Sequence, residues 1–534
     1  SWGAEGDIYI MFFDAKAMTE FFRDKEGTES AKMLAGDEKK DDKKDEKKDS
    51  VKKVEKIKLD LEGREDRIFR LTRNSGRIGT HFLTEDGKKL LYIVRLESGY
   101  DLCSMDLEDK SVRVLKKGVY GFVPSPDGKN IYISTGGGIS KMSVNGGESK
   151  SISYAGEYEY KPKAEREYIF DHMWKQVKEK FYDPDLHGVD WDYYRENYRK
   201  FLPYINNDFD FAELLSEILG ELNASHTGGR YRYSSGLSFG TLGVLYDSEY
   251  DGDGLKIKEV LPDGALSIAD SEIKAGDIIT SIEGKKIEAG KDWYQLLTGK
   301  AGKKIAITVK KGGKKETELF VTPGYSDNAL LYRRWVKMRE AKVKELSGGK
   351  IGYVHVQGMD SPSFREVYSK ALGKYRTADA LIVDTRHNGG GWLHDDLVTF
   401  LGGKDYVNYQ PRGRFIGKDP YSKWSKPSCV LVCEDNYSDA CGFPYAYKAL
   451  GIGKLIGAPV AGTMTAVWWE YQINSSIVFG IPQVGSWCID EGHYSENHQI
   501  EPDILVYNDP ASVLRGEDRQ LEAAVREMLA ETKK

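Results

Sequence analysis

The sequence predicts a multidomain protein of the mixed α/β and β classes, in which β-rich and helical segments precede a C-terminal α/β domain. Three observations lead to this prediction. The 534 residues suffice for about three to four domains. Two segments near the start repeat a tight turn followed by a strand. After about residue 326, short apolar strands alternate with helical segments, which is typical of a parallel sheet with crossover helices.

The composition excludes several classes of partner. Lysine and arginine number 78 against 84 aspartates and glutamates, and every basic cluster contains acids, so no nucleic-acid partner is expected. No stretch of 18 apolar residues exists, and Ser1–Glu5 lacks the layout of a signal peptide, so no membrane span is expected. Five cysteines are too few for a disulfide framework. A cytoplasmic location is expected, and a periplasmic one would require a missing N-terminal leader.

Residues 1–157 predict blades of a partial β-propeller. The segments 83–94 (LTEDGKKLLYIV) and 124–135 (PSPDGKNIYIST) share an Asp-Gly turn before an alternating strand, and these turns, at positions 86 and 127, lie 41 residues apart. Residues 7–13 would belong to a preceding blade. About two or three blades fit here and a closed propeller takes four or more, so we expect the chain to be the C-terminal part of a longer protein. Two unrelated hairpins are the alternative.

A charged insertion interrupts these blades. Residues 37–49 (DEKKDDKKDEKKD) are thirteen consecutive charged residues of balanced sign, with no apolar side chain to bury. The segment 31–57 is therefore predicted to be disordered.

Residues 158–236 predict a helical module. Lys163–Phe181 has apolar residues at helical spacing, and a second helix is expected to begin at Asp210 with an acidic N-cap. This helix is expected to end at Asn223–Ala224. It therefore delivers Ser225 and His226 to a turn just beyond its C-terminus.

Residues 237–325 return to short strands. Their order, with a "PDGAL" turn at 262–266, "AGDIITSIEGKKI" at 275–287, a helix near Trp293 and a closing strand KIAITVK, resembles a PDZ domain. Such a module offers a strand edge to which an extended peptide can be added. A small barrel without a ligand is the alternative.

Residues 326–534 predict the α/β domain. The expected strands are 351–356, 380–384, 429–433 and 454–456, and the expected helices are 363–375, 393–402 and 439–450.

Two strand ends in this domain carry candidate chemistry. The strand Cys429–Cys433 leads through a polar turn to Ser438, where a helix begins, so its hydroxyl would lie beside unpaired backbone N–H groups. A plain helix N-cap is the alternative role for Ser438. The second strand, 380–384, ends in a loop with three successive glycines, 389–391. No Lys-Ser/Thr pair follows them as in a phosphate-binding loop, so a nucleotide site is not favoured.

The motifs "ASHTGG", "DTRHNGGG" and "NYSDA", in this order around a PDZ-like insert, resemble the tricorn protease family, relatives of the C-terminal processing peptidases. The resemblance implies a crotonase- or Clp-like α/β catalytic core. It also implies roles for individual residues. Ser438 would be the nucleophile and His226 its general base. Glu496 and Ser225 would support the imidazole. The oxyanion hole would be formed by the backbone N–H groups of Gly391 and Asp439, with Gly390 as the alternative to Gly391.

Two comparisons within that family refine the expectation. Many processing peptidases use a Ser/Lys dyad with the lysine about two dozen residues after the serine, where this chain has Ala461–Thr465 and no lysine. A Ser/His mechanism is therefore favoured. The family prototype carries an acid that receives a basic P1 side chain, and the ungapped register places Tyr409 there. A neutral P1 residue is then expected, unless Asp405 takes the acid's place.

Structural roles are expected for the other candidate residues. The histidines His387, His394, His493 and His498 form no metal-ligand motif, so neither a metal nor a cofactor is expected. Cys429 and Cys433 belong to an apolar strand and are expected to be core thiols. Cys441 is an alternative nucleophile, because a helix N-terminus lowers a thiol pKa.

The sequence thus predicts a serine endopeptidase that cleaves oligopeptides or unfolded protein segments through an acyl-enzyme. The resemblance also implies a homo-oligomer, with a hexamer as the candidate size. A catalytically inactive peptide-binding scaffold built on the PDZ-like and propeller segments is the main alternative, and an acyl-CoA enzyme of crotonase type is another. The survival of Ser438, His226, Glu496 and the glycine triplet together favours the peptidase.

Overall fold

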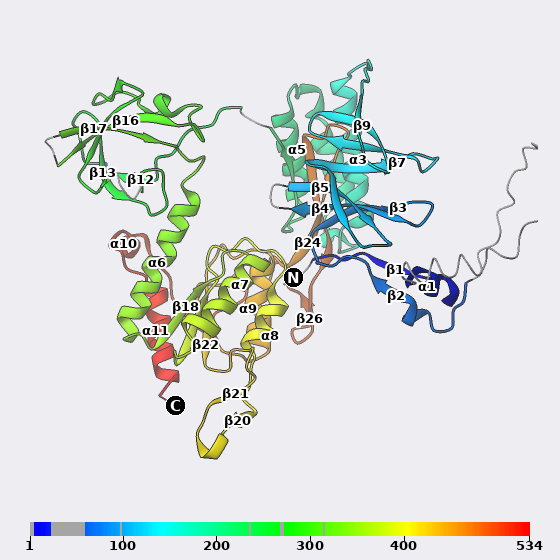
Figure 1. Ribbon diagram of the computed structural model, residues 1–534. Coiled ribbons are helices and arrows are strands. Elements are labelled where there is room, and N and C mark those ends of the chain that lie inside the picture. The colour runs from blue at the N-terminus through cyan, green and yellow to red at the C-terminus, as the bar shows by residue number, and fades with distance from the viewer. Residues whose placement is uncertain are drawn as a thin grey trace, which may run out of the picture. The chain divides into compact units, whose positions relative to one another are not determined.

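The computed structural model describes residues 5–22, 59–96, 99–233, 236–267, 272–312 and 315–533 (Figure 1). The chain divides into two compact units, with the boundary between Glu159 and Tyr160. The insertion predicted to be disordered, 31–57, lies outside the described residues. None of the helices in the described ranges combines the length and apolar character that crossing a bilayer requires.

The first unit contains two four-stranded antiparallel sheets built on the sequence repeat. Their orders are β3-β4-β5-β6 and β7-β8-β9-β10. In both repeated turns a hydroxyl donates to the aspartate, Thr84 to Asp86 and Ser125 to Asp127. The repeat is thus confirmed as one recurring turn. No sheet of the described residues closes on itself, so a propeller is not seen. The bounds are β3 Ile78–Leu83, β4 Lys89–Leu96, β5 Gly99–Asp106, β6 Val112–Lys116, β7 Val119–Pro124, β8 Asn130–Thr135, β9 Gly138–Ser143 and β10 Lys150–Ile152.

The helical module consists of α3 (Pro162–Lys180), α4 (Trp191–Arg199) and α5 (Asp208–Gly220). The second predicted helix, α5, starts two residues earlier than expected, because the side chain of Asn207, not Asp210, caps it by accepting the Asp210 N–H at 2.9 Å. The inner faces of α3 and α5 pack against one strand of the C-terminal domain, β25 (Ile477–Gly485).

A strand after α5 joins the module to the C-terminal domain. β11 (Gly228–Tyr231) pairs antiparallel with β25 in the sheet β11-β25-β24. A Cβ on Gly229 would lie 2.7 Å from the Ala212 carbonyl oxygen, so only glycine permits this close packing of α5 on β11. The turn between α5 and β11, which holds Ser225 and His226, is therefore fixed at both ends.

The β-rich segment that follows forms one antiparallel sheet in the order β12-β13-β14-β16-β17, with β15 paired to β14. Its core is aliphatic and includes Ile257, Ile279 and Ile307. The helix expected near Trp293 is a single 3₁₀ turn, Tyr294–Leu297. The strand bounds are β12 Val244–Tyr246, β13 Leu255–Val260, β14 Ile278–Ile282, β15 Lys285–Lys286, β16 Ile305–Lys311 and β17 Lys315–Val321.

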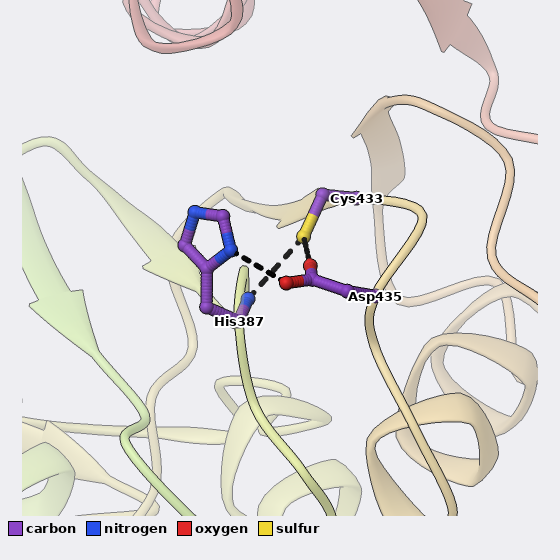
Figure 2. A group of neighbouring side chains, drawn as sticks. All are labelled: His387, Cys433 and Asp435. Carbon is purple, nitrogen blue, oxygen red and sulfur yellow. Dashed lines mark hydrogen bonds and ion pairs between the residues drawn. The ribbon is translucent and has the colours of Figure 1, made fainter.

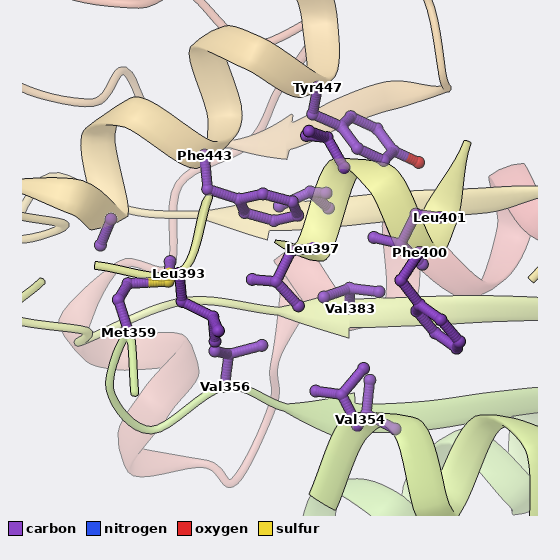
Figure 3. Close-up of a cluster of buried hydrophobic side chains, with 14 of the residues drawn as sticks. Val354, Val356, Met359, Val383, Leu393, Leu397, Phe400, Leu401, Phe443 and Tyr447 are labelled. Carbon is purple, nitrogen blue, oxygen red and sulfur yellow. The ribbon is translucent and has the colours of Figure 1, made fainter. Parts of the chain in front are cut away.

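The C-terminal domain is built on a five-stranded parallel sheet, in the order β18-β19-β22-β23-β28. One face carries Val354, Val383 and Val430, which pack with residues of α7, α8 and α9 (Figure 3). The other face packs against α6 and α11. The bounds are β18 Ile351–His355, β19 Ala380–Asp384, β22 Ser428–Val432, β23 Lys454–Gly457, β28 Ile504–Leu505, α6 Asn328–Ser347, α7 Ser361–Ser369, α8 His394–Leu401, α9 Asp439–Ala449 and α11 Arg519–Glu531.

Shorter elements complete the two units. In the first unit they are β1 Tyr9–Met11, which pairs antiparallel with β2 Ile68–Arg70, and α1 Ala15–Phe22. In the second they are β20 Val407–Tyr409, β21 Gly417–Asp419, β24 Thr465–Tyr471, β26 Trp487–Cys488, β27 His493–Tyr494 and α10 Pro510–Leu514.

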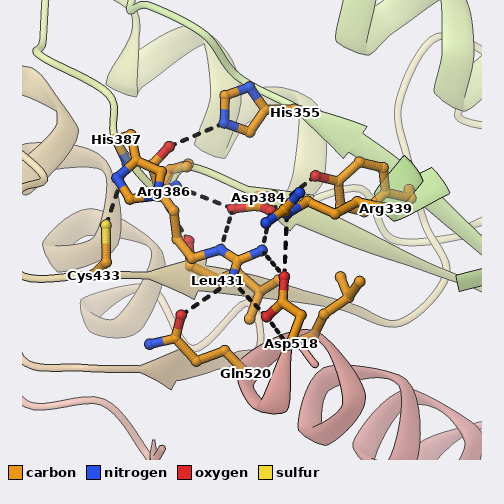
Figure 4. A network of polar contacts seen from close by, with 12 residues as sticks. Arg339, His355, Asp384, Arg386, His387, Leu431, Cys433, Asp518 and Gln520 are labelled. Carbon is orange, nitrogen blue, oxygen red and sulfur yellow. Dashed lines mark hydrogen bonds and ion pairs between the residues drawn. The ribbon is translucent and has the colours of Figure 1, made fainter. Parts of the chain in front are cut away.

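A buried ion pair secures the end of β19 (Figure 4). Arg386 donates to both carboxylate oxygens of Asp384, at 2.9 and 2.7 Å, and to Asp518 at the start of α11, at 2.8 Å. Burial opposes the ionisation of Asp384, but the charge and hydrogen bonds of Arg386 outweigh it and lower the Asp384 pKa to about 2. The ion pair thus fixes the chain three residues before the glycine triplet begins.

Candidate active site

Ser438 stands in a strained backbone conformation between β22 and α9. Its φ is 58° and its ψ −125°, a region that residues other than glycine seldom adopt. It occupies the N-cap position of α9, but its side chain caps no helical N–H. The N-cap role that the sequence left open therefore does not use the hydroxyl. Among the described residues, the Ser438 hydroxyl has no hydrogen-bond partner at all.

The glycine loop packs directly on Ser438. β19 and β22 are neighbouring parallel strands with Asp384 opposite Leu431, so the loops after them leave the same edge of the sheet. Gly390 has a φ of 98°, and a Cβ there would lie 2.5 Å from the Ser438 Cβ. A Cβ on Gly391 would lie 2.1 Å from the Met359 carbonyl oxygen. Glycine is required at both positions for this close approach.

The backbone N–H groups of this loop are not equivalent. The Gly390 N–H donates to the side-chain oxygen of Asn388, at 2.9 Å. The N–H groups of Gly391 and Asp439, in contrast, have no acceptor among the described residues. Of the two rivals that the sequence left open, Gly391 therefore has the N–H available for a ligand.

The side chain of Asp439 ties the two loops together. Its carboxylate accepts the backbone N–H groups of Leu393 and His394, the latter at 3.1 Å, at the start of α8. It also bonds the His394 ring, and this hydrogen bond raises the His394 pKa. The residue after Ser438 thereby holds the helix that follows the glycine loop, and His394 has the structural role that the sequence suggested.

His226 lies against the residue that precedes Ser438. Its backbone N–H donates to the Tyr437 hydroxyl at 2.7 Å, and the two rings pack with their centroids 4.7 Å apart. In the described part of the chain no hydrogen bond joins the His226 ring to the Ser438 hydroxyl. Catalytic hydrogen bonds are often long without substrate and tighten when it binds. Tyr437 thus links the predicted base to the predicted nucleophile.

Glu496, Ser225 and His226 form one hydrogen-bonded chain. Glu496 is 4% exposed and accepts both the backbone N–H and, at 3.0 Å, the hydroxyl of Ser225, 271 residues away in the sequence. The Ser225 hydroxyl is 2.8 Å from His226 Nδ1. Burial raises the pKa of Glu496 and lowers that of His226 to about 4, so the imidazole is neutral at pH 7. With Nδ1 facing hydroxyls, Nε2 is the nitrogen left to act as a base.

Two threonines complete this arrangement. Thr465 Oγ1 lies 3.0 Å from both the Ser225 hydroxyl and His226 Nδ1, and Thr463 Oγ1 accepts the Ser438 N–H at 3.1 Å. Neither threonine, nor Tyr437, was recognised from the sequence. The signal that the sequence offered for the two threonines was their position in the segment 461–465, where a dyad lysine would stand, and for Tyr437 its place directly before Ser438. An isolated threonine or tyrosine has no chemical signature of its own.

Tyr409 lies apart from this group. It ends β20, is 48% exposed, and its hydroxyl donates to Asp419 on β21. Asp405, its possible substitute, pairs with Lys418 at 2.6 Å. Within the described residues, none of the hydrogen bonds formed by these side chains reaches Ser438 or His226.

Cys441 does not have the environment of a nucleophile. It is fully buried in the first turn of α9, and this burial raises its pKa to about 11. The expectation that the helix N-terminus would lower the thiol pKa is therefore wrong, because desolvation is the largest influence on it. Cys429 is a core thiol, as predicted.

A cavity beside Glu496 connects the candidate site to solvent. This cavity, of about 560 Å³, is lined by Asn223, Ser225, Tyr437, Thr463 and Glu496, among others. A larger groove of about 780 Å³ lies between α6 and α7 and includes none of the predicted catalytic residues. The cavity therefore gives water access to the buried carboxylate.

Three family profiles match successive segments of the chain. They are the Tricorn protease C1 domain at residues 162–220, the Tricorn protease PDZ domain at 240–324 and Peptidase family S41 at 350–506.

Curated relatives and a solved structure agree with these matches. Tricorn protease homolog 1 of Streptomyces coelicolor is 28% identical over 89% of this chain and 47% of its own length, and Tricorn protease of Thermoplasma volcanium is 27% identical over 81% and 43%. The chain thus spans about half the length of the curated relatives it matches. A crystal structure of the tricorn protease shares the fold, with a TM-score of 0.78 at 21% identity over 90% of this chain and 49% of that one. The chain therefore belongs to the tricorn protease family, and its C-terminal domain is a serine-type peptidase domain of family S41.

Proposed function

We propose that this chain is the catalytic part of a serine endopeptidase that cleaves oligopeptides or unfolded protein segments. The observation that carries the proposal is the hydrogen-bonded chain from Glu496 through Ser225 to His226, assembled beside the strained Ser438. Membership of the tricorn family supports it, as does the glycine loop packed on Ser438.

The proposed reaction begins with proton transfer from Ser438 to His226. Nε2 of the neutral imidazole accepts the hydroxyl proton while Oγ attacks the substrate carbonyl carbon. The imidazolium Nδ1–H then donates a hydrogen bond to the Ser225 hydroxyl, and this hydroxyl donates a hydrogen bond to the Glu496 carboxylate. Glu496 thus stabilises a positive charge that burial alone disfavours. Ser225 is the positioning residue between them.

The backbone N–H groups of Gly391 and Asp439 are the proposed oxyanion hole. Both are free of acceptors among the described residues, whereas the Gly390 N–H is engaged by Asn388. One donor of this kind contributes roughly 2.7 to 4 kcal/mol to the transition state. The tetrahedral intermediate collapses when His226 returns its proton to the leaving amine, and a water molecule then hydrolyses the acyl-enzyme by the same route.

The remaining expectations extend this proposal beyond the catalytic group. We interpret the two four-stranded sheets as propeller blades. We further propose that these blades and the PDZ domain guide peptides to the site. Tyr409 remains a candidate for the residue that receives the substrate's P1 side chain. A homo-oligomer, with a hexamer as the candidate size, is proposed from the family resemblance, and sedimentation of the full chain measures it. An inactive scaffold or an acyl-CoA enzyme would not need the chain of contacts from Glu496 to His226.

Replacement of Ser438 tests the function directly. In a digest of a peptide library, the wild-type chain is expected to cleave, and Ser438→Ala to lose roughly 10⁶-fold in kcat because the nucleophile is gone. Ser369→Ala, at the exposed end of α7, is the control and should retain full activity. Equal cleavage by Ser438→Ala would contradict the proposal, and the wild-type cleavage sites report the P1 preference.

The glycine loop provides a matched pair of variants. Gly390→Ala places a Cβ 2.5 Å from that of Ser438, so one of the two must move, and a displacement of about 1 Å costs on the order of 100-fold in rate. Gly389→Ala meets nothing within 4 Å and should leave kcat/KM near wild type. The account is wrong if the two variants lose activity equally while both remain folded by circular dichroism.

The pH dependence of kcat/KM tests the state of His226. A general base acts only above its pKa, and burial lowers this pKa from 6.5 to about 4. Activity should therefore persist as the pH falls through 6.5 and decline only towards about pH 4. A profile of kcat/KM with its acid limb at pH 6–7, in a chain that circular dichroism shows to be folded, would argue against a buried neutral imidazole as the base.

A further inference from the structure

A second group of reactive side chains lies at the same edge of the sheet, outside the proposed catalytic group (Figure 2). Cys433 directly follows β22, Asp435 comes two residues later, and His387 is the third residue after β19. His387 and Cys433 are 46 residues apart in the sequence. Because β19 and β22 are paired in parallel register, their ends bring these residues together.

The three side chains offer ligand atoms of three kinds within a small volume. His387 Nδ1 lies 2.9 Å from Asp435 Oδ2, and Cys433 Sγ lies 2.7 Å from Asp435 Oδ1. All three ligand atoms lie within 4.8 Å of one another. The side chains of His387 and Asp435 are 60% and 63% exposed, and the thiol lies beneath them. An ion could therefore enter from solvent.

We propose that His387, Cys433 and Asp435 form a binding site for a thiophilic divalent cation of the Zn²⁺ type. Thiolate, imidazole and carboxylate are the ligands that Zn²⁺ takes in proteins, whereas Mg²⁺ and Ca²⁺ prefer oxygen alone. Three protein ligands leave the fourth tetrahedral position to water. Nothing in the proposed peptidase mechanism uses these three side chains.

The geometry suits a tetrahedral ion after a small adjustment. With zinc bonds of about 2.3 Å to sulfur and about 2.0–2.2 Å to nitrogen and oxygen, tetrahedral ligand atoms stand about 3.4–3.6 Å apart. The present separations of 2.9 and 2.7 Å need to widen by less than about 1 Å, and the third, between His387 and Cys433, which is at most 4.8 Å, needs to close by no more than about 1.3 Å. Two of the three ligands are exposed and can shift without disturbing the core.

The cation would take the place of the thiol proton. The Cys433 thiol donates to Asp435 Oδ1 at 2.7 Å, so it carries its proton in the absence of a metal. Binding releases that proton to solvent and leaves a thiolate bound to the cation. The two anions then offset the charge of the divalent ion, and the ion links the loop of Gly390 to the loop of Ser438.

Binding of Co²⁺ to the full chain tests this site without any measurement of peptidase activity. Under reducing, anaerobic conditions we expect one equivalent of Co²⁺ to give a thiolate-to-cobalt charge-transfer band, which Zn²⁺ then abolishes by displacement. Cys433→Ala should remove the band. His387→Ala and Asp435→Asn should each weaken binding at least about tenfold.

Two controls make the result specific. His493→Ala removes another histidine paired with a carboxylate, Glu491 at 3.2 Å, and should not change binding. Cys441→Ala removes a different buried thiol and should keep the band. The proposal is overturned if the folded wild-type chain gives no band, or if the band survives Cys433→Ala. If Cys433→Ala does not fold, the variant His387→Ala, which changes an exposed side chain, provides the test. Undiminished Co²⁺ binding by this variant also overturns the proposal.

Discussion

The proposed site depends on the hydrogen bonds that Ser225 donates to the buried Glu496 carboxylate. This carboxylate engages both the backbone N–H and the hydroxyl of Ser225, so it fixes the turn that carries His226 as well as the side chain beside its ring. A buried carboxylate is costly unless it is hydrogen-bonded, and these two donors meet that need. One contact therefore joins the helical module to the peptidase domain and orients the imidazole.

Two further constraints position Ser438, which directly follows the Tyr437 on which that imidazole packs. The parallel register of β19 and β22 places the glycine loop and the Ser438 turn at one edge of the sheet, and the buried pair of Asp384 and Arg386 fixes where the first loop begins. The Asp439 carboxylate then ties the two loops together through the start of α8. Backbone strain at Ser438 persists because these contacts determine its position from both sides.

The sequence predicted those parts that follow from local pattern. Apolar strands ending in polar or glycine-rich turns led to Ser438 and the glycine triplet, because neighbouring parallel strands end at one edge. His226 and Glu496 were reached only through the family resemblance. Thr465 and Tyr437 were missed because their contacts with His226 span 239 and 211 residues and leave no periodicity in the chain. His387 and Cys433 were considered one at a time and given structural roles, because the 46 residues between them leave no metal-ligand motif in the sequence.

Covalent labelling with a fluorophosphonate probe, mapped by mass spectrometry, tests the central claim most directly. The account predicts that the probe attaches to Ser438 of the wild-type chain and reacts much more slowly with Glu496→Gln, which can no longer stabilise the imidazolium. Failure of the wild-type chain to react, attachment to another residue, or an unchanged rate in Glu496→Gln would contradict it.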